Sequence, residues 1–504
     1  MKPYIPNHSL TPRSKRLFMI SVFIVLIANS GWTQIPEALK NKTELTSYAE
    51  LTQIVQDLDS DSRFSVSEAG KSGEGRSLWL IRISDPKQTV KWRVFFYAQQ
   101  HGNEPAGKEA LIYLARAIQK NPKLLGRGVE LWLMPMVNPD GAERDQRRNA
   151  VDADLNRDHM ILEQPETQAL HKTIRSIQPH LSIDCHEFAR DSDDYREKGW
   201  IEWTEIMMDY ANYPLLDDAL VLEGAGLVKR VGKAMVRQGV HFQRYFVGGV
   251  PPDGEQRYSA PDMDGGLNAA AIYGGLSFII EGGVYRNDNA DNHDLPMRIH
   301  NYTQLLFEVL KDKKIRRQSL PLLESKNAPE LPNWVPNNYF WAKSSESIIS
   351  IPVLDAKTKQ TIQTPAPNFM VDLVIKKSVS RPQAYIIPPE HADVFSQLLQ
   401  RHALPFQVLQ QAATYQVQYC LLDTVEMEFD ELYHRYGGRV ISSAQPVESQ
   451  IVEAGSLIVP VDIENGLRAM AILEPTQMFG LYQYPTYEIL ISKDRKLPVA
   501  RILN

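Results

Sequence analysis

The strongest constraint on the fold is an alternation of apolar, strand-like runs with amphipathic, helix-like runs between residues 48 and 313. Such runs are told apart by the spacing of their apolar residues. Helices are expected at 48–58, 106–119, 164–178, 219–239 and 298–313, and strands within 68–84, 91–98, 129–145, 181–187 and 267–283. Alternating strands and helices predict an α/β fold with a mixed, mostly parallel central sheet flanked by helices on both faces.

The N-terminus has the pattern of a secretory signal peptide. A basic stretch at 12–16 (PRSKR) precedes the apolar run 17–29, which is too short to span a bilayer comfortably, and small and polar residues follow. We expect residues 1–33 to be removed near Gln34, with a retained anchor as the alternative. This predicts a secreted or periplasmic protein without a stable membrane span after signal removal.

The remaining chain is expected to contain two domains, since its 504 residues allow about two or three. Residues 40–315 carry the strand and helix alternation. Residues 316–340 are rich in Pro and Asn and predict a linker. Runs such as IISIPVL and SLIVPVDI predict a smaller, β-rich C-terminal domain over 341–504, which lacks an evident cluster of catalytic residues.

The composition is that of an ordinary globular protein, with 23% charged and 43% hydrophobic residues. The net charge of −6 gives no reason to expect nucleic acid as a partner. The two cysteines, Cys185 and Cys420, are far apart in the sequence, and we expect two buried thiols rather than a disulfide. The oligomeric state is left open.

A candidate metal site begins at HGNEP, between the strand-like run 91–98 and the helix-like run 106–119. The carboxyl edge of an open α/β sheet is where sites are built. His101 and Glu104 are of residue types that zinc prefers, and catalytic zinc sites often use two His and one Glu. The alternative is that Glu104 decorates the helix start and His101 is a turn residue.

Two further strand-like runs end in ionisable residues, which favours a shared site. His186 closes an apolar run and completes a His, Glu, His set with one short and one long spacer. Glu281 ends the run LSFII and is the candidate base, because hydrolysis needs a group that takes the proton of water. The alternative for Glu281 is a solvated or ion-paired carboxylate. Residues 144–158 are dense in Arg, Asn and Asp, which predicts an anion-binding stretch or a solvated loop.

The motifs resemble those of the carboxypeptidase A-like zinc metallocarboxypeptidases over roughly residues 45–315. They occur in the order of that family: His101-Gly-Asn-Glu104, Asn138-Pro-Asp-Gly, Arg147-x-Asn149, Asp154-Leu-Asn156-Arg157, His186 and Glu281. The resemblance implies a zinc carboxypeptidase-like catalytic domain at 40–315. It also implies one Zn²⁺ per chain and a peptide substrate with a free C-terminal carboxylate.

The resemblance assigns roles position by position. His101, Glu104 and His186 match the zinc ligands, and Asp154 matches the acid that orients the first ligand. Arg147 matches the residue that stabilises the oxyanion.

Three further positions match residues of the reaction itself. Asn156 and Arg157 match the pair that grips the terminal carboxylate. Glu281 matches the general base of a zinc-activated water, which later returns its proton to the leaving amine.

Three departures from the family pattern bear on specificity. Tyr258 and Tyr273 both compete for the role of the tyrosine that covers the substrate, and Tyr258 is favoured because it lies in a polar loop. The context IDCHE of the third ligand is similar to the aspartoacylase branch. No acidic residue is evident at the base of a specificity pocket.

We therefore expect an exported metallocarboxypeptidase. A related zinc amide hydrolase acting on peptidoglycan stem peptides or N-acyl amino acids is the alternative. A non-catalytic binding protein on the same fold is a third hypothesis, which the retention of all three ligands, Arg147 and Glu281 disfavours.

Overall fold

The computed structural model describes residues 35–503 except 288–291, 325–330, 344–348 and 431–434. The expected signal peptide, residues 1–33, lies outside the described residues.

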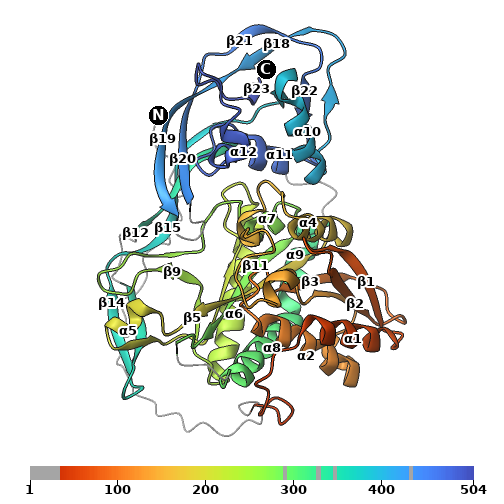
Figure 1. Cartoon of the computed structure of the whole chain (residues 1–504), viewed down its shortest axis with the longest axis vertical. Coiled ribbons are helices and arrows are strands. Elements are labelled where there is room, and N and C mark those ends of the chain that lie inside the picture. The colour runs from red at the N-terminus through yellow and green to blue at the C-terminus, as the bar shows by residue number, and fades with distance from the viewer. Residues whose placement is uncertain (1–34, 288–291, 325–330, 344–348, 431–434, 504) are drawn as a thin grey trace, which may run out of the picture. The chain divides into compact units, whose positions relative to one another are not determined.

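The scaffold of the site is an eight-stranded mixed sheet in the order β1-β2-β4-β3-β5-β11-β7-β8. β4, β3, β5 and β11 are mutually parallel, and antiparallel pairs occur at β1–β2, β2–β4 and β11–β7 (Figure 1). The strands are β1 (Phe64–Lys71), β2 (Ser77–Ser84), β3 (Trp92–Ala98), β4 (Val129–Met134), β5 (Leu181–Ala189), β7 (Ile206–Tyr210), β8 (Phe242–Arg244) and β11 (Leu276–Val284). The fold is therefore the expected α/β class.

Helices cover both faces of this sheet. α1, α2, α6, α8 and α9 cover one face of the sheet and form a continuous apolar core with it. α4 and α7 cover the other face. The helices are α1 (Tyr48–Asp59), α2 (Ala106–Lys120), α4 (Pro165–Ile177), α6 (Asp218–Arg237), α7 (Gly266–Ala271), α8 (Leu295–Lys311) and α9 (Lys313–Leu323). Because β3 and β5 are covered on both sides, nearly all their residues are buried. β3 is almost entirely apolar, whereas β5 also buries Ser182, Asp184, His186 and Glu187.

The topology of the sheet selects one edge for a site. After β3 the chain passes through α2 to β4 on one side of β3, whereas β5 pairs with β3 on the other side. The strand order therefore reverses between β3 and β5, and such a switch point leaves a crevice at the carboxyl ends of the strands. The loop after β3 begins at Gln99, and β5 ends at Ala189.

The C-terminal region builds further sheets, and two of them include strands that precede residue 315. β12 and β15 join β10 and β9, and β14 and β13 join β6. These strands are β6 (Trp200–Glu202), β9 (Phe246–Gly248), β10 (Gln256–Tyr258), β12 (Trp334–Lys343), β13 (Ile349–Asp355), β14 (Thr361–Ala366) and β15 (Phe369–Ser380). Strand pairing thus crosses the expected boundary at 341, and the domain division stays a prediction.

The last part of the chain forms a six-stranded sheet in the order β17-β22-β16-β23-β18-β21, a hairpin of β19 and β20, and the helices α10, α11 and α12 (Figure 1). The bounds are β16 (Ala384–Ile387), β17 (Gln407–Val408), β18 (Ala413–Gln418), β19 (Cys420–Asp430), β20 (Arg435–Ala444), β21 (Glu448–Val452), β22 (Leu457–Pro460), β23 (Ala500–Ile502), α10 (Ala392–Arg401), α11 (Gly466–Leu473) and α12 (Pro485–Glu488). The β-rich character of this region agrees with the sequence prediction.

The segment 316–340 differs from the expected linker. α9 continues to Leu323 although Pro321 lies inside it, and β12 begins at Trp334. Pro321 removes one backbone hydrogen bond of α9, two residues before the helix ends, and Pro336 lies in β12, an edge strand. A Pro-rich composition alone therefore did not exclude ordered structure here.

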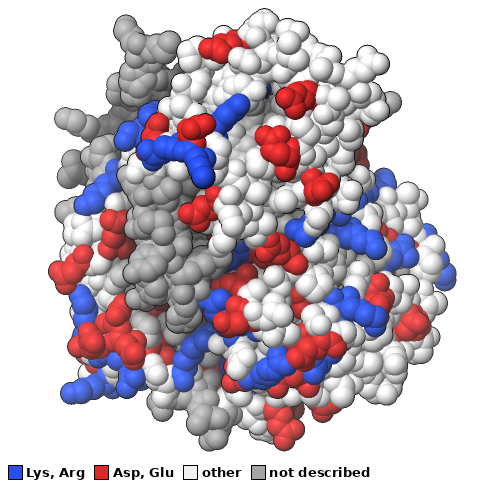
Figure 2. Space-filling view, turned by 45° about the horizontal axis from the view of Figure 1, so that its top comes forward, with Lys and Arg blue, Asp and Glu red and all other residues white. Residues whose placement is uncertain are grey.

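Both cysteines are unpaired and buried, as expected. Acidic and basic side chains are interspersed on the face shown in Figure 2. Within the described part of the chain, no helix combines the length and apolar character needed to cross a membrane.

Candidate metal centre and active site

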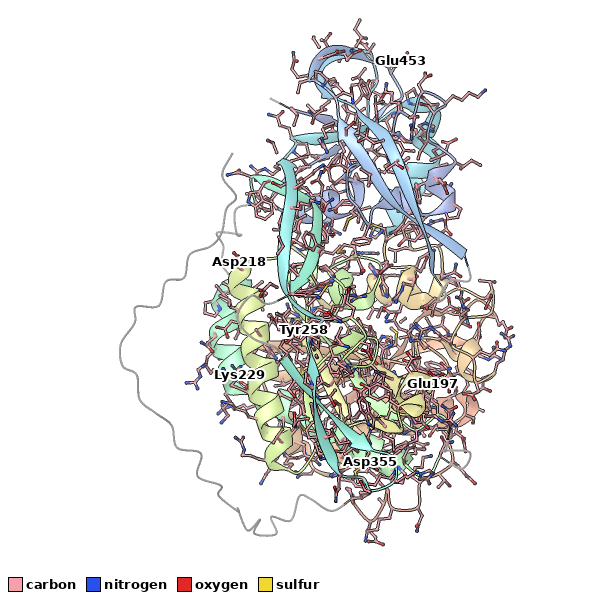
Figure 3. The ribbon with its side chains drawn as sticks, turned by 90° about the vertical axis from the view of Figure 1, so that its left-hand side faces the viewer. Glu197, Asp218, Lys229, Tyr258, Asp355 and Glu453 are labelled. Carbon is pink, nitrogen blue, oxygen red and sulfur yellow. The ribbon has the colours of Figure 1, made fainter. Side chains whose placement is uncertain are left out.

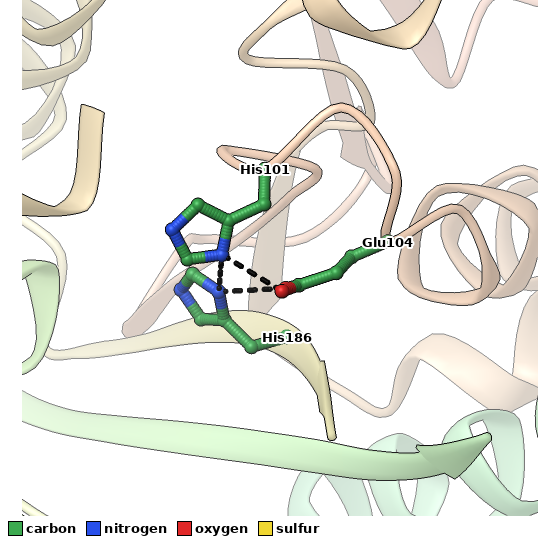
Figure 4. A group of neighbouring side chains, drawn as sticks. All are labelled: His101, Glu104 and His186. Atoms are coloured by element: carbon green, nitrogen blue, oxygen red, sulfur yellow. Dashed lines mark hydrogen bonds and ion pairs between the residues drawn. The ribbon is translucent and has the colours of Figure 1, made fainter. Parts of the chain in front are cut away.

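Three buried side chains converge at the carboxyl ends of β3 and β5. His101 Nδ1 lies 2.9 Å from Glu104 Oε1, and His186 Nδ1 lies 3.1 Å from Glu104 Oε2. The two Nδ1 atoms are 3.1 Å apart (Figure 4). All three residues are at most 3% exposed. This is the group among the described residues that could hold a metal ion.

The donor atoms fit a zinc ion. Ligands about 2.0–2.1 Å from a tetrahedral zinc lie roughly 3.3 Å from one another, close to the separations of these three atoms. Two imidazole nitrogens that face each other at 3.1 Å cannot both carry protons, so at least one lone pair points at the shared centre. The set of two His and one Glu is that of catalytic zinc sites.

The turn that carries His101 and Glu104 is held by close backbone packing. The backbone N–H of Glu104 donates to the carbonyl of His101, and the N–H of Gly102 donates to the carbonyl of Arg147. A Cβ on Gly102 would lie 2.1 Å from the carbonyl carbon of Gly141. Only glycine therefore allows the loop after β3 to approach the loop after β4 this closely.

Glu187, next to the ligand His186, locks the start of α2 against β5. Its Oε2 accepts a hydrogen bond of 2.9 Å from the N–H of Ala106, and its N–H donates to Glu104 Oε2 at 3.1 Å. Its Oε1 lies 2.5 Å from Nη1 of Arg298 in α8, and both side chains are at most 4% exposed. A carboxylate at a helix N-terminus is also favoured by the helix dipole. Glu187 thus fixes the position of the element that carries Glu104.

Asp154 lies behind the first histidine, as its match to the family implied. Its Oδ1 is 3.1 Å from His101 Nε2, so Nδ1 of the same ring is turned toward Glu104. Arg147 donates from Nε to Asp154 Oδ2 at 3.1 Å. Burial would raise the pKa of Asp154, but His101 and the two nearby guanidinium groups outweigh it and hold the pKa well below its usual range.

Arg147 lies at the rim of the metal centre. Its Nη1 is 3.3 Å from Glu104 Oε1 and 3.1 Å from His101 Nδ1, and its side chain is 31% exposed. A partly exposed guanidinium beside the ligand atoms can donate to an oxygen atom of a molecule that enters from solvent.

Glu281 lies on the strand next to the third ligand. Glu281 in β11 is the register partner of His186 in the parallel strand β5, so both side chains point to the same face. Burial raises the pKa of Glu281 to about 8, and the charge of Glu104 adds to this shift, while His186 and a hydrogen bond from Tyr245 oppose it. A carboxyl with a high proton affinity is suited to take up and return a proton.

Asn156 and Arg157 follow Asp154 in the short 3₁₀ turn η2 (Leu155–Arg157). Asn156 Oδ1 accepts a hydrogen bond of 2.8 Å from the N–H of Gly266, at the start of α7. Burial would lower the pKa of Arg157, but nearby carboxylates, Asp264 foremost, raise it. The structure therefore brings both residues beside the metal centre and against the segment before α7.

The predicted substrate tyrosine, Tyr258, has its ring engaged elsewhere. Tyr258 is labelled in Figure 3. It packs against Trp341 and Phe369 with ring centroids 5.8 and 5.2 Å apart, and the guanidinium of Arg244 lies 3.6 Å from its ring centroid. Its assigned role stays a prediction.

The tyrosine that influences the pKa of Glu281 is Tyr245, whose own pKa is raised by burial and by Glu281 and lowered by Arg257 and Arg157. Sequence reasoning missed Tyr245, because nothing in its local pattern (FQRYFVGG) distinguishes it from a buried strand residue.

Asp184 was also missed, although a signal for it existed. It lies two residues before His186 in β5, and residues two apart in a strand point to the same face. Its Oδ2 is 2.9 Å from Nε2 of His186, and its side chain is fully buried. Each ligand histidine therefore has a buried carboxylate behind its metal-facing ring: Asp154 for His101 and Asp184 for His186.

Comparison with known proteins agrees with this geometry. Residues 51–191 match the family described as zinc carboxypeptidase. Carboxypeptidase 2 of Trichophyton rubrum is 25% identical over 482 residues, covering 85% of this chain and 84% of that protein. Carboxypeptidase SOL1 of Arabidopsis thaliana is 38% identical over 135 residues, covering 23% of this chain and 28% of that protein. The solved metallo-carboxypeptidase of Burkholderia cenocepacia shares 18% identity at a TM-score of 0.42, covering 52% of this chain and 68% of that chain.

The α/β sheet and its buried His, Glu, His centre define the class of a metal-dependent hydrolase. Within that class, residues 51–191 match the zinc carboxypeptidase family, and the chain is a zinc metallopeptidase. The family match at 51–191 includes His101, Glu104 and His186 and ends before Glu281.

Proposed function

We propose that this metallocarboxypeptidase is exported, holds one zinc ion per chain through His101, Glu104 and His186, and hydrolyses the C-terminal peptide bond of peptides. The observation that carries the proposal is the convergence of the three ligand atoms beside Glu281 on the neighbouring strand. The signal-like N-terminus supports export to the periplasm or the cell exterior.

Zinc bound by these ligands supplies a Lewis acid that polarises water and the scissile carbonyl group. Glu281 takes the proton of the attacking water and later gives it to the leaving amine, which requires a carboxylate near both groups. Arg147, at the rim of the centre, donates hydrogen bonds to the carbonyl oxygen as negative charge develops there. Asp154 holds His101 in the orientation that directs Nδ1 to the ligand cluster.

Substrate binding is assigned to the side chains around Arg157. Asn156 and Arg157 hold the terminal carboxylate of the peptide by charge-assisted hydrogen bonds. Tyr245 interacts electrostatically with both Glu281 and Arg157, which supports a role beside the base and this carboxylate site. We therefore propose Tyr245 as the tyrosine that contacts substrate, in preference to Tyr258.

The test is cleavage of a peptide mixture varied at its C-terminus by the mature, zinc-loaded protein, with products identified by mass spectrometry. We expect loss of single C-terminal residues by the wild type. Glu281→Gln is expected to retain zinc and lose turnover. Glu308→Gln, at a half-buried position of α8 outside the site, is expected to behave as wild type.

Zinc content is measured on the same samples. A wild-type protein that holds zinc and releases no C-terminal residue would refute the peptide substrate. Stem peptides and N-acyl amino acids would then be tested, because both can present a free carboxylate to Asn156 and Arg157.

A further inference from the structure

A buried chain of hydrogen-bonded side chains runs from the metal centre into the layer of α4 and α7. Its first member is Gln100, which is fully buried and directly precedes the ligand His101. Its Nε2 donates to Asp184 Oδ2 at 2.7 Å, and its Oε1 lies 2.9 Å from His159 Nε2. The amide therefore bridges an aspartate and a histidine that are 25 residues apart in the sequence.

The chain continues through two more side chains. His159 Nδ1 lies 2.9 Å from His171 Nε2, and His171 Nδ1 lies 2.8 Å from the hydroxyl of Tyr273. Both histidines are at most 2% exposed. Every nitrogen of the two rings thus has a partner within the chain, which connects the loop after β3, the segment after η2, α4 and the end of α7.

The amide of Gln100 fixes the direction of all these hydrogen bonds. Its NH₂ must donate to the Asp184 carboxylate, so its oxygen accepts from His159 Nε2–H. Nδ1 of His159 then accepts from His171 Nε2–H, and Nδ1 of His171 accepts from the Tyr273 hydroxyl. This pattern requires each imidazole ring to be neutral, with a single ring proton. Burial favours the neutral rings, because it lowers the pKa of His159 to about 3 and that of His171 well below its usual value.

The inner end of the chain meets the metal ligand. Asp184 Oδ2 accepts from Gln100 and lies at ion-pair distance, 2.9 Å, from His186 Nε2. Neither Asp184 Oδ1 nor His186 Nε2 has a hydrogen-bond partner among the described residues. The orientation of this carboxylate is therefore set by Gln100. Gly266 closes the space beside it, because a Cβ there would lie 2.6 Å from Asp184 Oδ2 and 3.0 Å from Gln100 Nε2.

The outer end is covered by the C-terminal region. The guanidinium of Arg468 lies 5.4 Å from the ring centroid of Tyr273, and the ring of His402 meets that of His171 edge-on at 5.8 Å. His402 Nε2 also donates to the carbonyl of Met160, the residue after His159. These contacts exclude water from the chain, and hydrogen bonds are stronger in such a surrounding.

We propose that Gln100, His159, His171 and Tyr273 form a positioning chain that holds Asp184, and through it the ligand His186, in the orientation required to bind zinc. These residues touch neither substrate nor metal, and they reach the ligand His186 through Asp184. Gln100 Nε2 also lies 3.5 Å from Asn156 Oδ1. The inference rests on the proposed zinc site and extends the support of that site from one carboxylate to five side chains. Carboxylates and further partners behind metal-ligating histidines typically change metal affinity 10- to 100-fold when removed.

The test measures zinc affinity by competition with a chromophoric chelator and records the visible spectrum of the cobalt-substituted protein, which reports ligand geometry. Gln100→Leu removes the bridge and is expected to weaken zinc binding on the order of 10-fold and to change the cobalt spectrum. Tyr273→Phe removes only the last donor and is expected to produce a smaller change in the same direction.

Matched controls separate positioning from general loss of stability. Gln256 is also fully buried and donates two hydrogen bonds to backbone carbonyls away from the chain, so Gln256→Leu should leave zinc affinity unchanged in folded protein. Tyr213 is buried and its hydroxyl accepts from Gln477, so Tyr213→Phe is the control for Tyr273→Phe.

The outcomes decide between the two proposals. Wild-type affinity and an unchanged cobalt spectrum in Gln100→Leu would overturn the positioning chain, as would an equal loss of affinity in Gln256→Leu. If Gln100→Leu does not fold, the comparison of Tyr273→Phe with Tyr213→Phe decides, and equal zinc affinities would overturn the chain. A wild-type protein that binds no zinc would refute the metal site itself.

Discussion

Replacing Arg298 by methionine should destabilise the protein through the carboxylate it leaves behind. Arg298 Nη1 lies 2.5 Å from Glu187 Oε1, and the two side chains are 4% and 1% exposed. Methionine fills a similar volume but leaves Glu187 with the N–H of Ala106 as its remaining hydrogen bond among those described. Breaking a buried ion pair by removing one partner costs about 3–5 kcal/mol. We expect a loss of this size in the free energy of unfolding.

A second variant identifies the cause of the loss. If the unpaired Glu187 carboxylate is responsible, removing its charge as well should restore stability, whereas a cavity or a packing defect would remain.

The assay is urea unfolding followed by tryptophan fluorescence. The double variant Glu187→Gln/Arg298→Met removes the unpaired Glu187 charge and should recover most of the lost stability. Asp294, which also pairs with Arg298 and is 11% exposed, loses that partner in both variants. Arg196→Met breaks a pair with Asp193 that is more than half exposed and should cost less than about 0.5 kcal/mol. A deficit below about 1 kcal/mol for Arg298→Met, or no recovery in the double variant, would refute the reasoning.

Three further outcomes are expected. Gly102→Ala should cost about 1–3 kcal/mol or more of stability and weaken zinc binding, because its Cβ would meet the backbone of Gly141. Gly226→Ala should do neither, because its Cβ would face only the flexible end of an arginine side chain. Similar unfolding midpoints for the two variants would contradict this. Burial, partly opposed by a backbone hydrogen bond, lowers the pKa of His402 to about 3. Below about pH 6.5 the unfolded chain therefore binds a proton at His402, whereas the folded chain does not. Stability is then lost as pH falls, by about 2 kcal/mol at pH 5, and His402→Gln should reduce the difference between unfolding midpoints at pH 7 and 5. Removing the metal with a chelator should abolish peptidase activity and lower the melting temperature. Zinc at 1,000 times its dissociation constant should restore about 4 kcal/mol of the free energy of unfolding. A melting temperature that does not change with chelator would contradict the proposed metal centre.

Much of the fold and the ligand set could be predicted because both leave local signals. Apolar spacing indicated β3, α2, β5 and β11, since backbone geometry fixes a period of two or 3.6 residues wherever one face is buried. The candidate ligands were found because two of them share one turn and the third ends a strand. Glu281 was chosen because it also ends an apolar strand, and only the structure pairs that strand with the strand of His186.

Other features depend on partners that local spacing does not identify. Glu187 and Arg298 are 111 residues apart, and the Tyr273 hydroxyl meets His171 across 102 residues. Tyr245 reaches Glu281 from a short segment between two strands whose sequence resembles any buried strand. The strands after residue 333 pair with strands before residue 259, which a Pro-rich composition between them did not indicate.

The sequence by itself determined the order of strands and helices and the chemical identity of the metal ligands, because periodicity and motif spacing are properties of a continuous stretch of backbone. Only the tertiary structure decided which carboxylate, amide or guanidinium lies behind each ligand. Those contacts join segments far apart in the chain, and their free energy depends on burial and on distances of a few ångströms that arise only when the layers pack.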